Sequence, residues 1–187
     1  MVDDLNKACE VLQKGGVILY PTDTIWGIGC DATREDAVKR IYEIKRRSDS
    51  KSMLTLLDSP TRLDRYVDDL PEIALHLIEC SDKPLTIIYP GAKNIASNLI
   101  APDGTIGIRI TREAFSQQLC RQFGKPIVST SANFSGDPAP ADFSEINSEF
   151  LRLVDYVVNY KRDETQKSKP SRIIRLDKNG TVNVIRE

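Results

Sequence analysis

The chain has 187 residues, 40% of them hydrophobic and 28% charged, a composition that excludes extensive disorder and collagen-like repeats. Its 26 Lys and Arg residues nearly balance 27 Asp and Glu residues, which excludes a general binder of long polyanions. A single histidine, His76, and four widely spaced cysteines without a CxxC pair argue against histidine triads, histidine-rich metal centres and zinc sites.

Length and hydropathy predict a cytoplasmic protein of one domain. At ~150 residues per domain, residues 1–187 fit one domain better than two. No apolar run reaches the ~20 residues that span a bilayer, and residues 1–10 lack the charged-then-apolar order of a signal peptide. We therefore expect no membrane contact, and we expect the cysteines to be buried free thiols.

Hydrophobic periodicity predicts helices and strands in turn along the chain. The expected helices cover residues 4–14, a segment from the cap Thr33 to about Arg46, 60–80 with a break at Pro71, 113–123 and 142–151. The expected strands cover residues 17–20, 53–57, 85–89, 105–110, 127–131, 154–158, 171–176 and 181–186. This order predicts an α/β fold in which helices flank one mixed β-sheet.

Positive charge is concentrated in two segments of this nearly neutral chain. Residues 39–51 contain six basic and two acidic side chains, and residues 161–175 contain the same numbers. The dipole of a helix that ends near Arg46 explains one or two of these cations. The remainder favour an anionic ligand, either a phosphorylated small molecule or nucleic acid. Lys45 and Arg47 can point to one side of the chain and clamp phosphate oxygens.

Hydroxyl and amide side chains crowd the end of the expected strand 127–131. The segment VSTSANFSG contributes Ser129, Thr130, Ser131, Asn133 and Ser135. Such groups bind phosphate or carboxylate beyond the strand ends of open α/β sheets, although a turn that caps the sheet is the other interpretation. Arg109 favours a ligand, because it stands opposite Ile108 and Ile110 in TIGIRI and a strand arginine needs an anionic partner if it is buried.

A dinucleotide site is the competing interpretation of residues 27–32. The segment GIGCDA has the GxGxxA spacing of that fingerprint, and Asp58 follows a later strand. However, six residues separate the strand 17–20 from Gly27, whereas the fingerprint places its first glycine in the turn directly after the strand. We therefore expect these glycines to serve turns and close packing. The chain has no Walker motif.

Four segments occur in the order found in one family: GGVILYPTDTIWGIGCDA, IKRRSDSK, IGIRI and STSANFSG. From Gly15 to Gly136, with a further match at residues 170–174, the chain resembles the YrdC-type threonylcarbamoyl-AMP synthases. The resemblance implies a twisted α/β sheet around a positively charged concavity, and ATP-dependent condensation of L-threonine with bicarbonate. The products would be threonylcarbamoyl-AMP and pyrophosphate, with Mg²⁺ entering on ATP. A separate transferase complex would then use the intermediate to modify adenosine 37 of tRNA.

The resemblance also implies roles for individual residues. Lys45 and Arg47 would be the catalytic, phosphate-binding pair. L-Threonine would contact Thr22, Arg109, Ser129 and Ser171. The nucleotide would contact Lys45, Arg47, Lys51, Ser131, Asn133 and Arg186. The protein ligands of the metal stay unknown, and segment 161–170 is the expected lid over the site.

Three departures from the family pattern keep a second function open. Ser52 stands where the family usually has proline, and SDKPLT at residues 81–86 replaces an aromatic-PGPLT segment. Arg172 replaces the threonine of an STV-like segment. These changes resemble a divergent branch of YrdC-like proteins. The alternative is therefore a non-enzymatic YrdC-like protein that binds RNA or a nucleotide.

Overall fold

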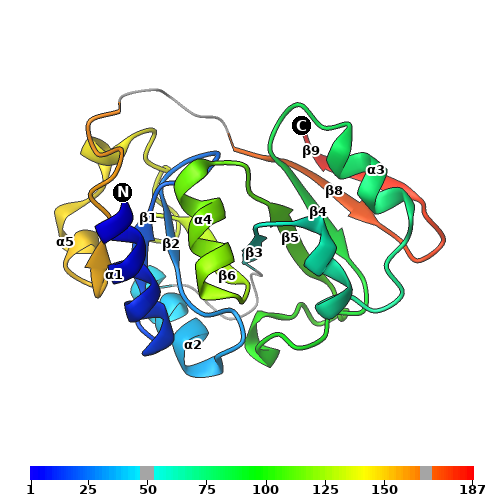
Figure 1. Ribbon diagram of the computed structural model, residues 1–187, viewed down its shortest axis with the longest axis horizontal. Coiled ribbons are helices and arrows are strands. Elements are labelled where there is room, and N and C mark those ends of the chain that lie inside the picture. Colours follow the sequence, from blue (N-terminus) through cyan, green and yellow to red (C-terminus); the bar gives the residue numbers. More distant parts are fainter. Residues whose placement is uncertain (47–52, 165–169) are drawn as a thin grey trace.

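The computed structural model describes residues 1–46, 53–164 and 170–187 (Figure 1). Within these ranges the strands are β1 (Ile18–Tyr20), β2 (Gly27–Gly29), β3 (Leu54–Leu57), β4 (Leu85–Tyr89), β5 (Ile106–Ile110), β6 (Ile127–Ser131), β7 (Tyr156–Val157), β8 (Arg172–Leu176) and β9 (Val182–Arg186). They form one mixed sheet in the order β7-β1-β2-β6-β3-β5-β4-β8-β9. The predicted α/β fold with a mixed sheet is confirmed.

Helices flank this sheet. They are α1 (Val2–Gln13), α2 (Glu35–Lys45), α3 (Ile73–Glu79), α4 (Ala114–Phe123) and α5 (Ser148–Leu151), with the 3-10 helices η1 (Pro60–Arg65), η2 (Ser97–Leu99) and η3 (Phe143–Glu145). In Figure 1, α1 and α4 lie side by side in front of the sheet. Phe115, Leu119 and Phe123 recur at the spacing of one helical face and are buried. Burying each of these side chains stabilises the fold by about 1.5–3 kcal/mol.

The register of the central strands brings the predicted site segments together. β6 pairs antiparallel with β2, so that Ser131 lies opposite Gly27. β5 runs parallel to β3 and antiparallel to β4, where Arg109 lies opposite Thr86. The segments YPTDTIWG, IGIRI and STSAN therefore reach one region at the centre of the sheet.

Most predicted elements are confirmed to within one or two residues. The strands over 85–89 and 127–131 have the predicted bounds. The helical stretch expected over 60–80 is divided, but the break covers residues 66–72, so Pro71 lies near its end, just before α3. α2 ends at Lys45, and Arg46 follows it in the left-handed conformation with φ 51°.

Two predicted helical features are wrong. Arg34, not Thr33, occupies the cap position of α2, because the Thr33 hydroxyl donates to Asp31 Oδ1 at 2.6 Å instead. The helix expected over 142–151 is divided into η3 and α5. Between them Ile146 has φ −69° and ψ 126°, an extended conformation that breaks the helical hydrogen bonds.

The glycines of GIGCDA lie in strand β2, where a turn was expected. A Cβ atom on Gly29 would lie 2.4 Å from the carbonyl oxygen of Val128 and 2.7 Å from Tyr20 Cε1, so the predicted close packing is confirmed. β2 runs antiparallel to both β1 and β6, so it is not part of a parallel βαβ unit, and its glycines lie in the strand and not in the turn before α2. The dinucleotide interpretation is therefore wrong. Asp58 instead pairs with Arg62, with 3.3 Å between Oδ1 and Nη1.

The four cysteines are free thiols, as predicted. Cys9, Cys30 and Cys120 are buried, but Cys80 is exposed at the end of α3. Burial raises the pKa of the Cys120 thiol far above its usual value. The buried thiols therefore act as small packing groups rather than nucleophiles.

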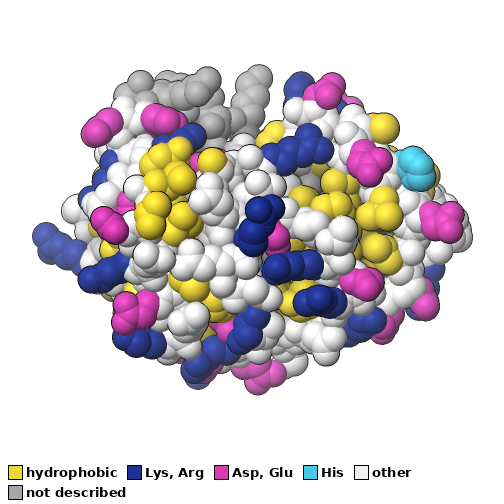
Figure 2. All heavy atoms as spheres, viewed as in Figure 1, with side chains coloured by type: hydrophobic (Ala, Val, Ile, Leu, Met, Phe, Trp, Pro, Cys, Tyr) yellow, Lys and Arg dark blue, Asp and Glu magenta, His cyan; other side chains and the backbone are white. Residues whose placement is uncertain are grey.

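Hydrophobic side chains stay exposed at the β9 end of the sheet. Ile73 on α3 is 42% exposed, and Val184 and Ile185 on the edge strand β9 are 64% and 58% exposed. Figure 2 shows hydrophobic side chains gathered over α3. Within the described ranges no helix has the length and apolar character needed to span a membrane.

Candidate functional site

A cavity of about 250 Å³, here called the β6 cavity, lies at the end of β6 beside β5 and β8. Its wall contains five of the residues that the resemblance placed at a site: Arg109, Ser129, Ser131, Ser171 and Arg186. The rest of the wall includes the apolar side chains of Ile25, Trp26, Met53, Leu54 and Ile173. Because these residues come from six separate segments of the chain, the sheet topology is what gathers them.

Ser171 and Arg186 are held together at one wall of the β6 cavity. Arg186 donates from Nε and Nη2 to the carbonyl oxygen of Ser171, at 3.1 and 2.9 Å. The Ser171 hydroxyl lies 2.9 Å from the Thr86 hydroxyl, and both residues are buried. These contacts fix a hydroxyl and a guanidinium group side by side in the wall.

Ser129 lies where a glycine makes room for it. Its side chain is on β6 beside Gly27 of β2, and a Cβ atom on Gly27 would come within 3.2 Å of Ser129 Oγ. Ser129 is 5% exposed. The glycine therefore lets the serine hydroxyl sit between the two strands at the edge of the cavity.

Arg109 meets a carboxylate that the sequence analysis did not single out. Its Nε atom lies 3.0 Å from Asp23 Oδ1, and the two side chains are 3% and 10% exposed. A buried strand arginine was expected to need an anionic partner, and Asp23 is that partner. The signal in the sequence was the lone acidic residue of the YPTDT segment.

Burial acts against both charges of this pair. It lowers the pKa of the Arg109 guanidinium, while the Asp23 carboxylate opposes that change. It raises the pKa of Asp23, while Arg109 opposes that change. Each charge is therefore stabilised in the interior by the other, and removing either one leaves an uncompensated buried ion.

Lys45 ties the end of α2 to the loop that follows β6. Its Nζ atom donates to the carbonyl oxygens of Ser131 and Asn133, at 2.5 and 2.8 Å, and the residue is 2% exposed. The backbone N–H of Ser135 donates to the Lys45 carbonyl oxygen at 2.9 Å. The predicted phosphate-binding helix end and the SAN loop are thus in direct contact.

The cations that follow Lys45 in the sequence are Arg46, Arg47 and Lys51. Arg46 stacks on Phe134, with 4.3 Å from its guanidinium carbon to the ring centre, and Nη2 pairs with Glu149 at 2.7 Å. Arg47 and Lys51, both assigned to the nucleotide by resemblance, lie outside the described residues.

Asn133 lies in a different pocket. Its Nδ2 atom donates to the carbonyl oxygens of Phe134 and Asp137, at 3.1 and 2.7 Å. Within the described residues its Oδ1 atom is buried without a hydrogen-bond partner. The residue lines a hollow of about 310 Å³ with Asp137, Glu145 and Asn147, separate from the wall that holds Arg109.

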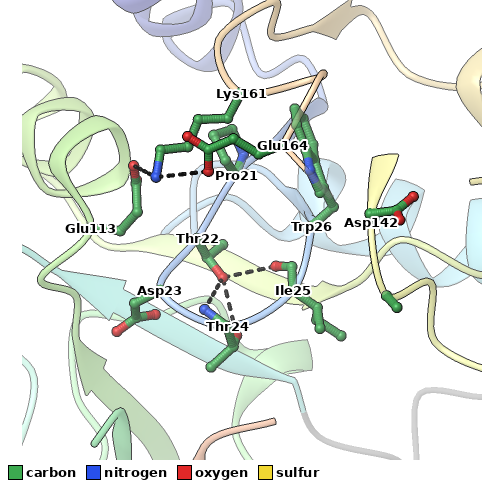
Figure 3. A pocket seen from close by; sticks show the side chains of 11 residues that line it. Pro21, Thr22, Asp23, Thr24, Ile25, Trp26, Glu113, Asp142, Lys161 and Glu164 are labelled. Atoms are coloured by element: carbon green, nitrogen blue, oxygen red, sulfur yellow. Dashed lines mark hydrogen bonds and ion pairs between the residues drawn. The ribbon is translucent and has the colours of Figure 1, made fainter. Parts of the chain in front are cut away.

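Thr22 lines a second cavity, of about 180 Å³, on the other side of the turn after β1 (Figure 3). Its hydroxyl donates to the Ile25 carbonyl oxygen at 2.8 Å and accepts from the Thr24 N–H at 3.1 Å. The hydroxyl therefore holds the turn, and the structure does not place it in the wall of the β6 cavity. Trp26 borders both cavities.

The described part of the expected lid contributes to this second cavity. Lys161 Nζ lies 3.8 Å from Glu113 Oε1 and 3.3 Å from Glu164 Oε2, as Figure 3 shows. Residues 165–169 of the expected lid lie outside the described residues. Segment 161–164 is thus anchored beside the turn that carries Thr22 and Asp23.

One comparison identifies the family. The family model Sua5_yciO_yrdC, described as telomere recombination, matches residues 10–187. The chain belongs to this family. The resemblance noted in the sequence is therefore confirmed over almost the entire chain.

Several bacterial relatives of this chain are named threonylcarbamoyl-AMP synthase. A threonylcarbamoyl-AMP synthase of Pseudoalteromonas translucida is 36% identical over 155 residues, covering 81% of this chain and 83% of that protein. E. coli YciO superposes with a TM-score of 0.83 at 28% identity, covering 98% of this chain and 88% of that one. P. abyssi Sua5 in complex with L-threonine superposes with a TM-score of 0.85 at 26% identity, over 92% of this chain and half of that one.

Proposed function

We propose that this chain is a threonylcarbamoyl-AMP synthase, which condenses L-threonine, bicarbonate and ATP and releases pyrophosphate. The observation that carries the proposal is the β6 cavity, where Arg109, Arg186 and three serines meet in a chain of this family. The name of the Pseudoalteromonas relative and the threonine complex of P. abyssi Sua5 support it.

The β6 cavity suits an amino acid. The Arg109 guanidinium is the group for the threonine carboxylate, because its planar N–H fork matches a carboxylate. Ser129 and Ser171 offer hydroxyls within the same wall, beside its apolar side chains. The threonine amine would attack the bicarbonate carbon with loss of water, which forms a carbamate. A carbamate oxygen would then attack the α-phosphorus, and the bond to pyrophosphate would break.

Catalysis of this kind depends on positioning and on charge neutralisation, since both reactants are anions. Lys45 stands at the helix end beside Ser131 and Asn133 and is assigned, with Arg47, to the phosphates. Arg186 adds a cation at the same cavity. The proposal requires a positively charged concavity, and within the described residues Arg109 and Arg186 are the cations of the β6 cavity wall.

Mg²⁺ is part of the proposal only as a companion of ATP. The described residues contain no group of three or more His, Cys, Asp or Glu side chains arranged to hold a metal. The donor set does not fit a protein-held ion, so we assign no step to one. The product, an acyl adenylate, is an activated donor, and the family resemblance implies that a tRNA-modifying transferase complex would consume it.

The decisive experiment measures pyrophosphate release from ATP and bicarbonate with and without L-threonine. We expect pyrophosphate release to depend on threonine. It should fall at least tenfold in Arg109→Ala, because this variant lacks the buried guanidinium that binds the threonine carboxylate. Arg121→Ala is the matched control, since Arg121 is 68% exposed and lies outside the site. Release without threonine, or no release, would contradict the proposal. RNA binding that weakens steeply with salt in an inactive protein would favour the alternative function.

A further inference from the structure

A buried carboxylate lies behind the arginine of the β6 cavity. Arg109 lines that cavity, whereas Asp23 lines two neighbouring cavities and is absent from its wall. The two side chains form an ion pair with 3.0 Å between Nε and Oδ1, and within the described residues neither of these two atoms makes a hydrogen bond. Asp23 therefore touches Arg109 on the side turned away from the β6 cavity.

We propose that Asp23 is the positioning residue of the amino-acid site: its carboxylate holds the Arg109 guanidinium through the ion pair at Nε, so that the terminal nitrogens are left to bind the substrate carboxylate. The proposal rests on the synthase function and on Arg109 as the carboxylate ligand. Asp23 touches no reacting atom in this scheme and acts through Arg109.

The shape of the guanidinium group explains why such a contact matters. Arginine has five N–H donors in a rigid plane, so fixing one edge of the plane sets the direction of the other donors. Paired N–H bonds to a carboxylate need both terminal groups in one orientation. A carboxylate behind Nε supplies that orientation before the substrate arrives, which lowers the entropic cost of binding.

The turn after β1 presents Asp23 to Arg109. The Thr22 hydroxyl closes this turn by its hydrogen bonds to Ile25 and Thr24. In Figure 3 the Asp23 carboxylate points away from Lys161 and Glu164. The resemblance assigned Thr22 to the substrate. In the structure, the Thr22 hydroxyl holds the turn that carries the next residue, Asp23.

Charge balance at the cavity is consistent with an amino-acid carboxylate. Asp23 neutralises Arg109, and Arg186 at the same cavity adds one further positive charge that also disfavours the Arg109 cation. Glu113, which faces Asp23, has Lys161 3.8 Å away. The Arg109–Asp23 pair is thus close to neutral, as suits a zwitterionic amino acid, while Arg186 supplies the net positive charge of the wall.

The test compares Asp23→Asn with the wild-type protein. Titration calorimetry measures the Kd for L-threonine, and pyrophosphate release measures the separate KM values for threonine and ATP. We expect the threonine Kd and KM to rise about tenfold or more, because Arg109 loses its orientation, while the KM for ATP stays within about twofold. Asp23→Glu restores the charge and should recover part of the lost threonine affinity.

Asp58→Asn is the matched control. Asp58 is also a buried carboxylate paired with an arginine, with 5% side-chain exposure and 3.3 Å to Arg62, but it lies outside the β6 cavity. This variant should be less stable than the wild type. Its Kd for threonine and its KM values for threonine and ATP should change by no more than about twofold. Equal effects of Asp23→Asn on threonine and ATP, or none on threonine, would overturn the positioning role.

Two further results also bear on the proposal: an Asp23→Asn variant that does not fold, and a wild type that releases no pyrophosphate. If Asp23→Asn does not fold, Asp23→Glu is measured in its place, because the extra methylene of glutamate shifts the carboxylate relative to Arg109. A threonine Kd raised at least about threefold at constant ATP affinity supports the proposal, and unchanged affinity for both overturns it. If the wild type releases no pyrophosphate but binds threonine, the synthase function fails while the calorimetric comparison still decides the role of Asp23. A wild type that binds no threonine overturns both.

Discussion

The Lys45 ammonium group lies 2.5 Å from the carbonyl oxygen of Ser131, at the end of the strand that forms the site. A second carbonyl, that of Asn133, accepts from the same nitrogen at 2.8 Å. Lys45 is therefore both a candidate phosphate ligand and the donor that secures the SAN loop. The helix end and the loop move as one unit if this contact holds.

Replacing Lys45 with methionine removes both roles, and two assays measure the two losses separately. Lys45→Met keeps the aliphatic stem but leaves two buried carbonyls without this donor, so the free energy of unfolding should fall by about 1–3 kcal/mol. The KM for ATP should also rise. Urea denaturation and pyrophosphate assays measure the two effects. Lys39→Met, on the same helix with 71% side-chain exposure, should change stability by less than about 0.5 kcal/mol.

Gly29 tests the close packing of β2. Gly29→Ala places a Cβ atom 2.4 Å from the backbone oxygen of Val128, which cannot move without distorting the sheet. We expect a loss of roughly 3 kcal/mol in thermal or urea unfolding. Gly107→Ala is the control in strand β5, where the nearest atom, Leu54 Cβ, is 3.5 Å away. That variant should be neutral within about 0.5 kcal/mol or slightly stabilising. Equal losses in both variants would show that β2 is not packed as described.

Asp4 predicts a pH dependence of stability. The residue is 7% exposed, and its Oδ1 atom accepts from the Tyr156 hydroxyl at 2.5 Å and from the Asn159 N–H at 2.9 Å. Burial raises the pKa of Asp4, but these hydrogen bonds outweigh burial and hold it below 3.8. A carboxyl whose pKa is lowered on folding stabilises the protein above its unfolded pKa. That contribution is lost as the pH falls through the folded pKa.

The variant Asp4→Asn should therefore lose about 1.5–3 kcal/mol at pH 7, with the gap to wild type closing as the pH falls below about 4. Denaturant unfolding between pH 3 and pH 7 measures this gap. Asp3→Asn is the control, since Asp3 lies exposed in the same first turn of α1 and removes the same charge from the helix dipole. A gap for Asp4→Asn that is constant with pH would contradict the role of its ionised form.

Trp26 offers a direct signal of ligand binding. It is the one tryptophan of the sequence, it is 6% exposed, and it borders both the β6 cavity and the second cavity. A ligand that fills the β6 cavity displaces water from the indole ring of Trp26 and changes the polarity of the ring's surroundings. We expect L-threonine to shift or quench the fluorescence of the wild type in a saturable way. Arg109→Ala should show no such change at the same concentrations, and an identical change in that variant would place threonine elsewhere.

Local sequence was sufficient for features that depend on a few neighbouring residues. The end of α2 near Arg46, the break at Pro71 and the alternation that places Arg109 on one face of β5 follow from helix dipoles, a missing N–H and strand periodicity. β2 could not be predicted in this way, because a three-residue segment with two glycines has little strand propensity of its own. Its pairing with β1 and β6 imposes the extended conformation.

The sequence by itself determined the α/β class, the order of most elements, the family and the types of side chain available: arginines, a lysine and hydroxyls, with almost no histidine. Only the tertiary structure decided which of these side chains meet. It placed Arg109 beside Asp23, Lys45 beneath the SAN loop, and Thr22 in a turn rather than in the wall of the β6 cavity. Periodicity and capping act between near neighbours, whereas these contacts join segments that only sheet pairing brings together.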